Sequence, residues 1–217
     1  MSKKDTILDV AEIAGKTAIS LIPVGGALAT AIYDTVKGNA LAKRQDQWKR
    51  TLEDRISKIE ETLESIGNNE LFTTALVKAT ELAMRTSREE KMSYLANAVI
   101  SSLAPNIDEE KLIIFLDLLD KYTISHIKII KFFNNPTYFT EVSNSPYMMG
   151  SPATVLFQAY PELDNVLFKK VYKDLYIDGM VNTENLNINV TGSAMVAKRT
   201  TELGDDFLRF ISSNTTE

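Results

Sequence analysis

Five basic side chains near the C-terminus have the types and spacing best suited to a binding site. Three share the outward face of a helix predicted over about 163–178, and two follow in a predicted β-wing. They are Lys169, Lys170, Lys173, Lys198 and Arg199. Lysine and arginine at such places contact DNA phosphates, so the set predicts a nucleic-acid patch. Acidic residues nevertheless outnumber basic ones over 151–217, so we favour a protein partner and keep DNA as the alternative.

The chain offers little for catalysis. Its one histidine, His126, has neither a cysteine nor a second histidine to complete a nucleophilic triad or a histidine metal site. We interpret His126 as a packing or helix-surface residue. Gly15-Lys16-Thr17 matches the end of a phosphate-binding loop, but that loop needs a glycine where Val10 stands.

Clustered carboxylates could hold a divalent ion, and four clusters occur. They are Glu60-Glu61, Glu89-Glu90, Asp108-Glu109-Glu110 and Asp205-Asp206. Most fall in the first turn of a predicted helix, where a carboxylate interacts favourably with the helix dipole. The sequence therefore predicts no catalytic residues, no metal and no cofactor.

An apolar stretch near the N-terminus is the most distinctive hint of function. Residues 17–33 are uncharged, but Pro-Val-Gly-Gly interrupts them, and a membrane-spanning helix needs about 20 unbroken apolar residues. Two apolar half-helices joined by a turn suit a hairpin in the protein core, which we favour, or a hairpin that enters a bilayer after activation. The residues of this hypothetical membrane-active hairpin are Leu21, Ile22, Pro23, Val24, Gly25, Gly26 and Leu28.

The composition limits the classes of function. The chain has 217 residues, 44% of them hydrophobic and 24% charged, as in ordinary globular proteins. Its net charge of −5 gives no general attraction to nucleic acid or acidic lipid. It has no cysteine, and its first residues lack the apolar core of a secretory signal, so we expect a cytoplasmic protein.

The apolar pattern predicts helices over most of the chain. One long helix carries a seam with spacings close to those of a coiled coil, which leaves homo-oligomerisation open, although packing within one chain is favoured. The seam residues are Trp48, Leu52, Ile56, Ile59, Leu63 and Ile66. Farther along, Ser87 to Glu90 have the capping-box spacing, and Asp108 and Thr123 are predicted to cap the next two helices.

The last third of the chain predicts a different architecture. Ser151-Pro152 begins one helix, and a second ends at Gly179. Segments rich in Val, Ile, Thr and Asn around Thr191-Gly192-Ser193 predict a two-stranded hairpin. A last helix should bury Leu203, Phe207, Leu208 and Ile211. Helix, helix, β-wing and helix, with the Thr-x-Leu-Gly restart after the wing, resembles the pattern of winged-helix modules.

The middle block, over about 70–136, carries three motifs. They are a leucine-alanine-asparagine helix at Tyr94 to Ala98, a Phe-x-x-Leu-Leu helix at Phe115 to Leu119, and a capped helix ending at Asn135-Pro136. This pattern resembles the helical region of bacterial abortive-infection alpha-type (Abi-alpha-like) proteins. The resemblance implies a helical protein tied to phage defence and brings no catalytic residues. The Pro-Val-Gly-Gly hairpin is similar to the N-terminal region of membrane-acting death effectors built as helical bundles.

Together these patterns predict a mainly α protein. Residues 1–136 should form a helical bundle with the apolar hairpin, 137–150 a linker, and 151–217 a small winged-helix-like α+β module. The expected function is that of a non-enzymatic interaction or effector protein in phage defence, with a protein partner and the hairpin as the acting part. The alternative is a winged-helix DNA-binding transcriptional regulator.

Overall fold

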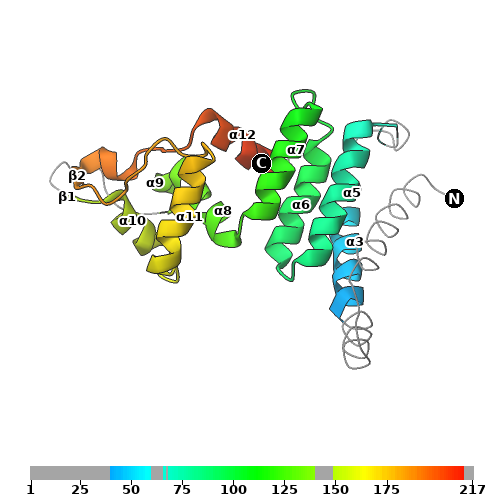
Figure 1. Ribbon diagram of the computed structural model, residues 1–217, viewed down its shortest axis with the longest axis horizontal. Helices are drawn as coiled ribbons and strands as arrows, with labels where there is room; N and C mark the ends of the chain where they lie inside the picture. Colours follow the sequence, from blue (N-terminus) through cyan, green and yellow to red (C-terminus); the bar gives the residue numbers. More distant parts are fainter. Residues whose placement is uncertain (1–39, 60–65, 67, 140–148, 213–217) are drawn as a thin grey trace. The chain divides into compact units, whose positions relative to one another are not determined.

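The computed structural model describes residues 40–59, 66, 68–139 and 149–212, which form two compact units (Figure 1). Unit 1 takes its described residues from 1–120 and 210–217, and unit 2 from 121–209. These residues are mainly helical, as predicted. In chain order the elements are α3 (Ala42–Ile56), α5 (Glu70–Arg85), α6 (Glu89–Ser101), α7 (Glu109–Lys121), α8 (Ile124–Asn134), α9 (Pro136–Phe139), β1 (Met149–Gly150), α10 (Pro152–Ala159), α11 (Asn165–Ile177), β2 (Val190–Thr191), the 3-10 helix η2 (Gly192–Val196) and α12 (Glu202–Ile211).

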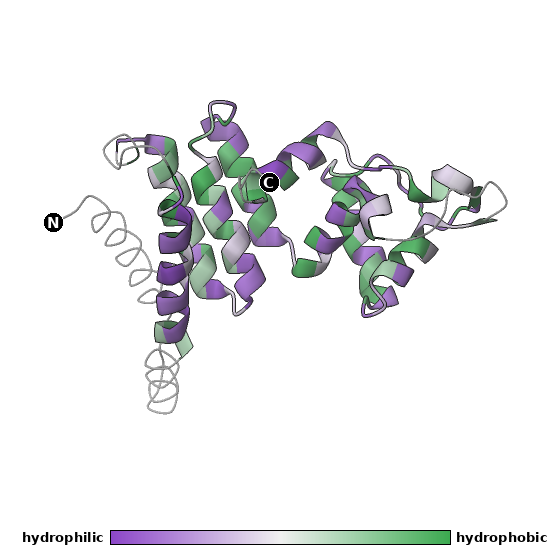
Figure 2. Cartoon of the chain, turned by 180° about the vertical axis from the view of Figure 1, so that it is seen from behind, coloured by the Kyte–Doolittle hydropathy of each residue, from purple (hydrophilic) through white to green (hydrophobic). Residues whose placement is uncertain are grey.

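Unit 1 is built on the mutual packing of α3, α5 and α6. Trp48 of α3 is buried, and its indole N–H donates to the Thr80 hydroxyl of α5 at 3.0 Å. Trp48, Leu52 and Ile56 are all buried, so these members of the predicted seam pack within the chain. Figure 2 shows green apolar and purple hydrophilic residues alternating along the helices, as expected for elements with one buried face.

The outer surface of unit 1 is tied by ion pairs between α5 and α7. Lys78 Nζ lies 2.5 Å from an Asp117 carboxylate oxygen, and Arg85 lies 3.2 Å from Asp120. Surface pairs of this kind contribute about 0–1 kcal/mol each. They nevertheless show that Lys78 and Arg85 already have acidic partners.

Several predicted helix starts are confirmed. The Asp108 carboxylate accepts from the Lys111 backbone N–H at 2.8 Å, and the Ser151 hydroxyl accepts from the Thr154 N–H at 3.2 Å. The prediction of a capping box that starts at Ser87 is wrong, because Arg88 is the N-cap of α6 and makes no side-chain cap hydrogen bond.

Unit 2 packs α8 against α11, and α12 approaches the chain just after α11 very closely. A Cβ on Gly204 would lie 2.3 Å from the Met180 carbonyl oxygen, so only glycine fits at this place in α12. This contact gives a physical reason for the glycine in the Thr-x-Leu-Gly restart. Leu203 beside it is 39% exposed, so its predicted burial is wrong, whereas Phe207, Leu208 and Ile211 are buried.

The predicted wing hairpin is only partly formed. Val181 and Thr200 make an isolated antiparallel bridge at its base, supported by a 2.9 Å hydrogen bond from the Asn182 N–H to the Arg199 carbonyl. Beyond that bridge the two segments do not pair as strands. Instead β2 pairs antiparallel with β1, and η2 takes the place of the predicted second strand. The hairpin predicted around Thr191-Gly192-Ser193 is therefore not confirmed beyond the bridge at its base.

The division between the units also differs from the predicted linker at 137–150. The first stretch of unit 1 ends at Asp120, and α8 packs with α11 in unit 2. The apolar face of α8, which includes the buried Ile127, Ile130 and Phe133, explains this placement, because such a face must be covered by a neighbouring helix.

Candidate functional site

Helix α11 presents the most conspicuous surface of unit 2, and local sequence fixes both of its ends. The Asp164 carboxylate accepts from the N–H groups of Val166 and Leu167, each at 2.8 Å. At the other end, Met180 N–H bonds to the Leu175 carbonyl, and Gly179 adopts a φ of 72°, a left-handed conformation that costs glycine little. The side chains of Phe168, Val171, Tyr172 and Leu175 point inward and are buried, as predicted.

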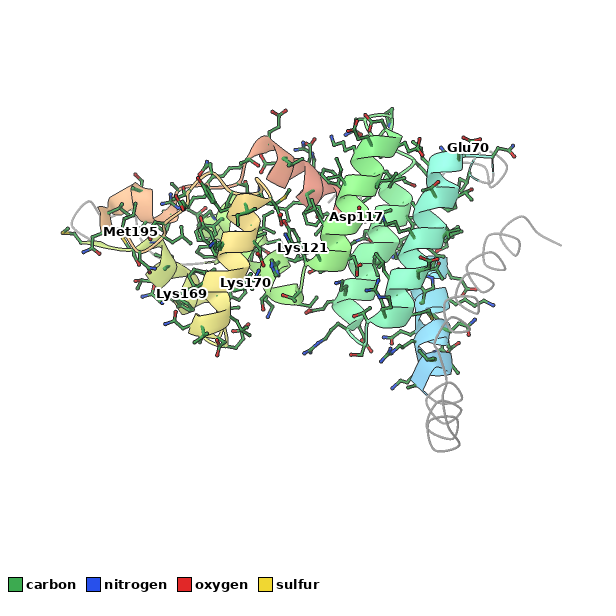
Figure 3. All side chains as sticks on the ribbon, viewed as in Figure 1. Glu70, Asp117, Lys121, Lys169, Lys170 and Met195 are labelled. Atoms are coloured by element: carbon green, nitrogen blue, oxygen red, sulfur yellow. The ribbon has the colours of Figure 1, made fainter. Side chains whose placement is uncertain are left out.

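The outward face of α11 combines basic and apolar side chains. Val166, Lys169, Lys173 and Ile177 recur at helical spacing and are all exposed. Val166 is 80% exposed and Ile177 is 65% exposed, which is unusual for side chains of this type. Neither lysine forms an ion pair with any residue that the structure describes. Lys169 is labelled on α11 in Figure 3.

A groove of about 320 Å³ lies between α11 and the segment Glu184–Asn187. Its wall includes apolar and aromatic side chains, both exposed lysines, one carboxylate and two amides. The lining residues are Phe168, Lys169, Tyr172, Lys173, Tyr176, Ile177, Glu184, Asn185, Leu186 and Asn187. A mostly apolar concavity with a few polar groups is the usual form of a ligand or peptide site.

The structure brings together only two members of the predicted basic patch, Lys169 and Lys173. Lys170 lies outside the groove lining and pairs with Asp174 at 2.5 Å, one turn farther along α11. Lys198 pairs with Asp205 at 2.6 Å. These carboxylates neutralise two of the five charges that the sequence assigns to phosphate binding.

Arg199 is used inside the unit. Its guanidinium donates to the Thr183 hydroxyl at 3.2 Å and to the Ala194 carbonyl at 2.6 Å. Its Nε is buried and has no hydrogen-bond partner among the described residues. Burial lowers the pKa of Arg199 from its ordinary value. The side chain thus braces the loop between α11 and α12 and is poorly placed to contact a nucleic acid.

His126 belongs to a second polar cluster, where α8 meets α11. It is 5% exposed, which confirms the prediction of a packing residue. The Thr123 N–H donates to its Nδ1 at 3.1 Å, so the neutral ring carries its proton on Nε2. Nε2 lies 3.6 Å from the Asp174 carboxylate, too far for a hydrogen bond. The Tyr122 ring stacks on the imidazole with centroids 4.8 Å apart.

The charges around this cluster are internally balanced. Tyr122 donates to Asp178 at 2.9 Å, and Lys121 reaches the same carboxylate at 2.6 Å. Burial lowers the pKa of His126, and the nearby Asp174 carboxylate offsets only part of this shift. Burial and the hydrogen bond to Asp178 together raise the pKa of the Tyr122 hydroxyl. We interpret the cluster as a structural joint, because Asp174 pairs with Lys170, Asp178 pairs with Lys121, and the His126 ring is buried.

The apolar hairpin, Leu21 to Leu28, lies outside the described residues. Within the described part of the chain, no helix has the length and apolar character required to cross a membrane. The same residues contain no group of three or more His, Asp or Glu side chains arranged to hold a metal ion.

The sequence did not point to six of the ten residues that line the groove. Tyr176 and Ile177 come one and two residues after Leu175, the last buried residue of α11. Their exposed position is predictable, because they lie three and four residues after Lys173 and therefore on the same side of the helix. The opposite wall, Glu184 to Asn187, lies in the segment 181–190, for which the composition predicts the first strand of the wing, and nothing in that composition predicts that it faces α11.

Comparison with known proteins gives no match. No protein-family model matches the chain, and neither curated proteins nor solved structures show significant similarity to it.

Proposed function

We propose that the protein is a non-enzymatic interaction protein whose unit 2 binds a segment of a partner protein in the groove beside α11. One observation carries this proposal. Exposed apolar side chains and two lysines without an ion-pair partner among the described residues share one helix face at a groove. A helix with acidic and apolar side chains on one face complements this surface, because recognition of this kind buries apolar anchors and surrounds them with opposite charges.

The surroundings favour protein over DNA as the partner. Lys170 and Lys198 are held by carboxylates, and Arg199 is held by Thr183 and Ala194. Binding to duplex DNA depends on many phosphate contacts, and two lysines beside a carboxylate supply few.

The test uses a labelled synthetic helical peptide whose Glu-Glu pair precedes an Ile-Ile pair by one turn. Binding is followed by fluorescence anisotropy. We expect saturable binding that Lys169→Glu with Lys173→Glu weakens at least ~10-fold, since two rim charges change from attraction to repulsion. The matched control, Lys43→Glu with Arg88→Glu, makes the same change in net charge at two exposed sites outside the groove. Absence of binding, or equal weakening by both double variants, contradicts the proposal.

A winged-helix regulator is the second candidate function. Its support is the antiparallel bridge between Val181 and Thr200, which closes the loop between α11 and α12 as the base of a wing would. In that case α11 would be the recognition helix and Lys169 and Lys173 would contact phosphate. Binding to a labelled DNA duplex should then appear at low salt and fall steeply as salt rises. Absence of binding at low salt ends this alternative.

The acting part of the proposed effector is the N-terminal hairpin, residues 21–28, on the ground of its apolar sequence. Partner binding would release it to enter a bilayer in a cytoplasmic phage-defence response, the setting that the Abi-alpha-like resemblance suggests. Flotation with liposomes tests this, and Val24→Asp with Leu28→Asp should abolish co-flotation of the full chain. A wild-type chain that fails to float even with a bound peptide contradicts a membrane role.

A further inference from the structure

We propose that the segment bound in the α11 groove is helix α7 of a second copy of this chain. This inference rests on the proposed function, because it names the partner of the same groove. It follows from charge and apolar complementarity between two exposed helix faces of one molecule.

Helix α7 carries an acidic and apolar stripe on its exposed side. Glu109 and Glu110 begin the helix, and Ile113 and Ile114 follow one turn later, with 38% and 45% of their surface exposed. Neither glutamate has an ion-pair partner among the described residues. Asp117, one further turn along and labelled in Figure 3, is engaged by Lys78, so the two glutamates supply the available charge.

Helix α11 carries the complementary order of residues. Lys169 and Lys173 come first, and Tyr176 and Ile177 follow within one turn of Lys173. In α7 the two glutamates, and in α11 Lys173, therefore precede the apolar pair by about one turn, or about 5.4 Å along the axis, and Lys169 lies one turn before Lys173. Parallel packing of the two helices sets the glutamates against the lysines and the isoleucines against Ile177 and Tyr176. The groove between α11 and Glu184–Asn187 then receives the isoleucine side chains.

The two faces are different surfaces, so the contact is heterologous. A copy that offers α7 to one neighbour still offers its α11 groove to another. Such contacts close into a ring or extend as a filament, and they do not stop at a symmetric dimer. Sedimentation velocity therefore should show species larger than a dimer as the protein concentration rises. Added salt should weaken the association, because exposed charges are screened.

A charge exchange between the faces tests the pairing in the full chain. One variant carries Lys169→Glu with Lys173→Glu, and the other carries Glu109→Lys with Glu110→Lys. Each alone sets like charges against each other and should associate at least ~10-fold more weakly than the wild type. An equal mixture restores opposite charges at every contact and should associate like the wild type.

Two controls match these variants. Glu89→Lys with Glu90→Lys makes the same charge change in the first turn of another helix, α6, so it reproduces the cost to the helix dipole. Lys43→Glu with Arg88→Glu matches the lysine variant in charge. Both controls should associate like the wild type, and thermal melts check that all variants remain folded.

Three outcomes overturn the inference: a wild type that stays monomeric at every concentration, single variants that associate normally, or a mixture that stays dissociated. The peptide assay with monomeric protein separates this failure from that of the proposed function. If the protein binds the peptide but does not self-associate, the groove binds a different partner protein. If it neither binds the peptide nor self-associates, the groove is not a binding site.

Discussion

The α5–α7 face of unit 1 and the outward face of α11 in unit 2 treat their charges differently. On unit 1, Lys78 and Arg85 of α5 each meet a carboxylate of α7, at 2.5 and 3.2 Å. On unit 2, Lys169 and Lys173 of α11 stand beside exposed apolar side chains and meet no carboxylate among the described residues. The first pattern ties neighbouring helices together. The second leaves charge and apolar surface available to another molecule, which is why we propose it as the binding face.

The largest expected effect on stability lies in the core of unit 1. Trp48→Ala removes a fully buried side chain and its hydrogen bond to Thr80, so it should lower the free energy of unfolding by about 3–5 kcal/mol. Urea denaturation measures the change. By contrast, Lys169→Glu with Lys173→Glu should alter stability by only about 0.5 kcal/mol, since both side chains are exposed. If the lysine double variant lost as much unfolding free energy as Trp48→Ala, the two lysines would be structural residues rather than part of an exposed binding face.

The next effect lies inside unit 2, where α12 meets the chain after α11. Gly204→Ala places a Cβ against the Met180 backbone carbonyl, which cannot move without the chain, and should cost about 1–3 kcal/mol. Gly150→Ala is the matched control, because its Cβ would meet only the flexible end of Met195 at 2.9 Å. Thermal unfolding should rank Gly204→Ala well below Gly150→Ala. Equal melting temperatures would show that the close approach of Gly204 to the Met180 carbonyl does not affect stability.

The smallest effect is a pH dependence from His126. Burial lowers the pKa of His126 in the folded state from its ordinary value of 6.5. As the pH falls below 6.5, the unfolded chain therefore takes up the proton on His126 more readily than the folded chain does. The stability contributed by the neutral ring is complete above pH 6.5 and is lost as pH falls below it. The groups that face the ring are Tyr122, Thr123 and Asp174, with Lys121 and Asp178 nearby.

His126→Gln should flatten the loss of stability between about pH 7 and pH 5, a window set by the ordinary histidine pKa. Chemical denaturation at a series of pH values measures the slope. Asp174, whose pKa is lowered chiefly by its bond to Lys170, contributes a loss only around and below pH 3.8, outside this window. An unchanged slope in the variant would mean that His126 titrates normally in the folded protein.

Local signals predicted the helices well. Asp108 and Ser151 cap the helices that they were expected to cap, and the seam of Trp48, Leu52 and Ile56 is buried. These predictions depend on side chains acting on the backbone within one turn or on one periodic face. Both effects can be read directly from sequence spacing.

Long-range pairing could not be predicted in the same way. The segment around Val190 has the composition of a strand, but its partner is Met149–Gly150, about 40 residues earlier, and no local pattern specifies that choice. The pairing of Lys170 with Asp174, four residues later on the same helix, can be read from spacing, but the limit applies to Lys198 and Arg199. Their charges are visible in the sequence, whereas Asp205 and Thr183 become their neighbours only through the fold.

The most direct test of the α11 groove is methyl NMR on isoleucine-labelled protein during titration with the acidic amphipathic peptide. Ile177 lines the groove, and Ile188, which is 44% exposed, lies outside the lining and serves as the internal reference. The Ile177 methyl signal should shift with saturation while that of Ile188 stays in place. Saturable binding that leaves Ile177 unshifted would place the partner elsewhere and contradict the assignment of α11 as the binding face.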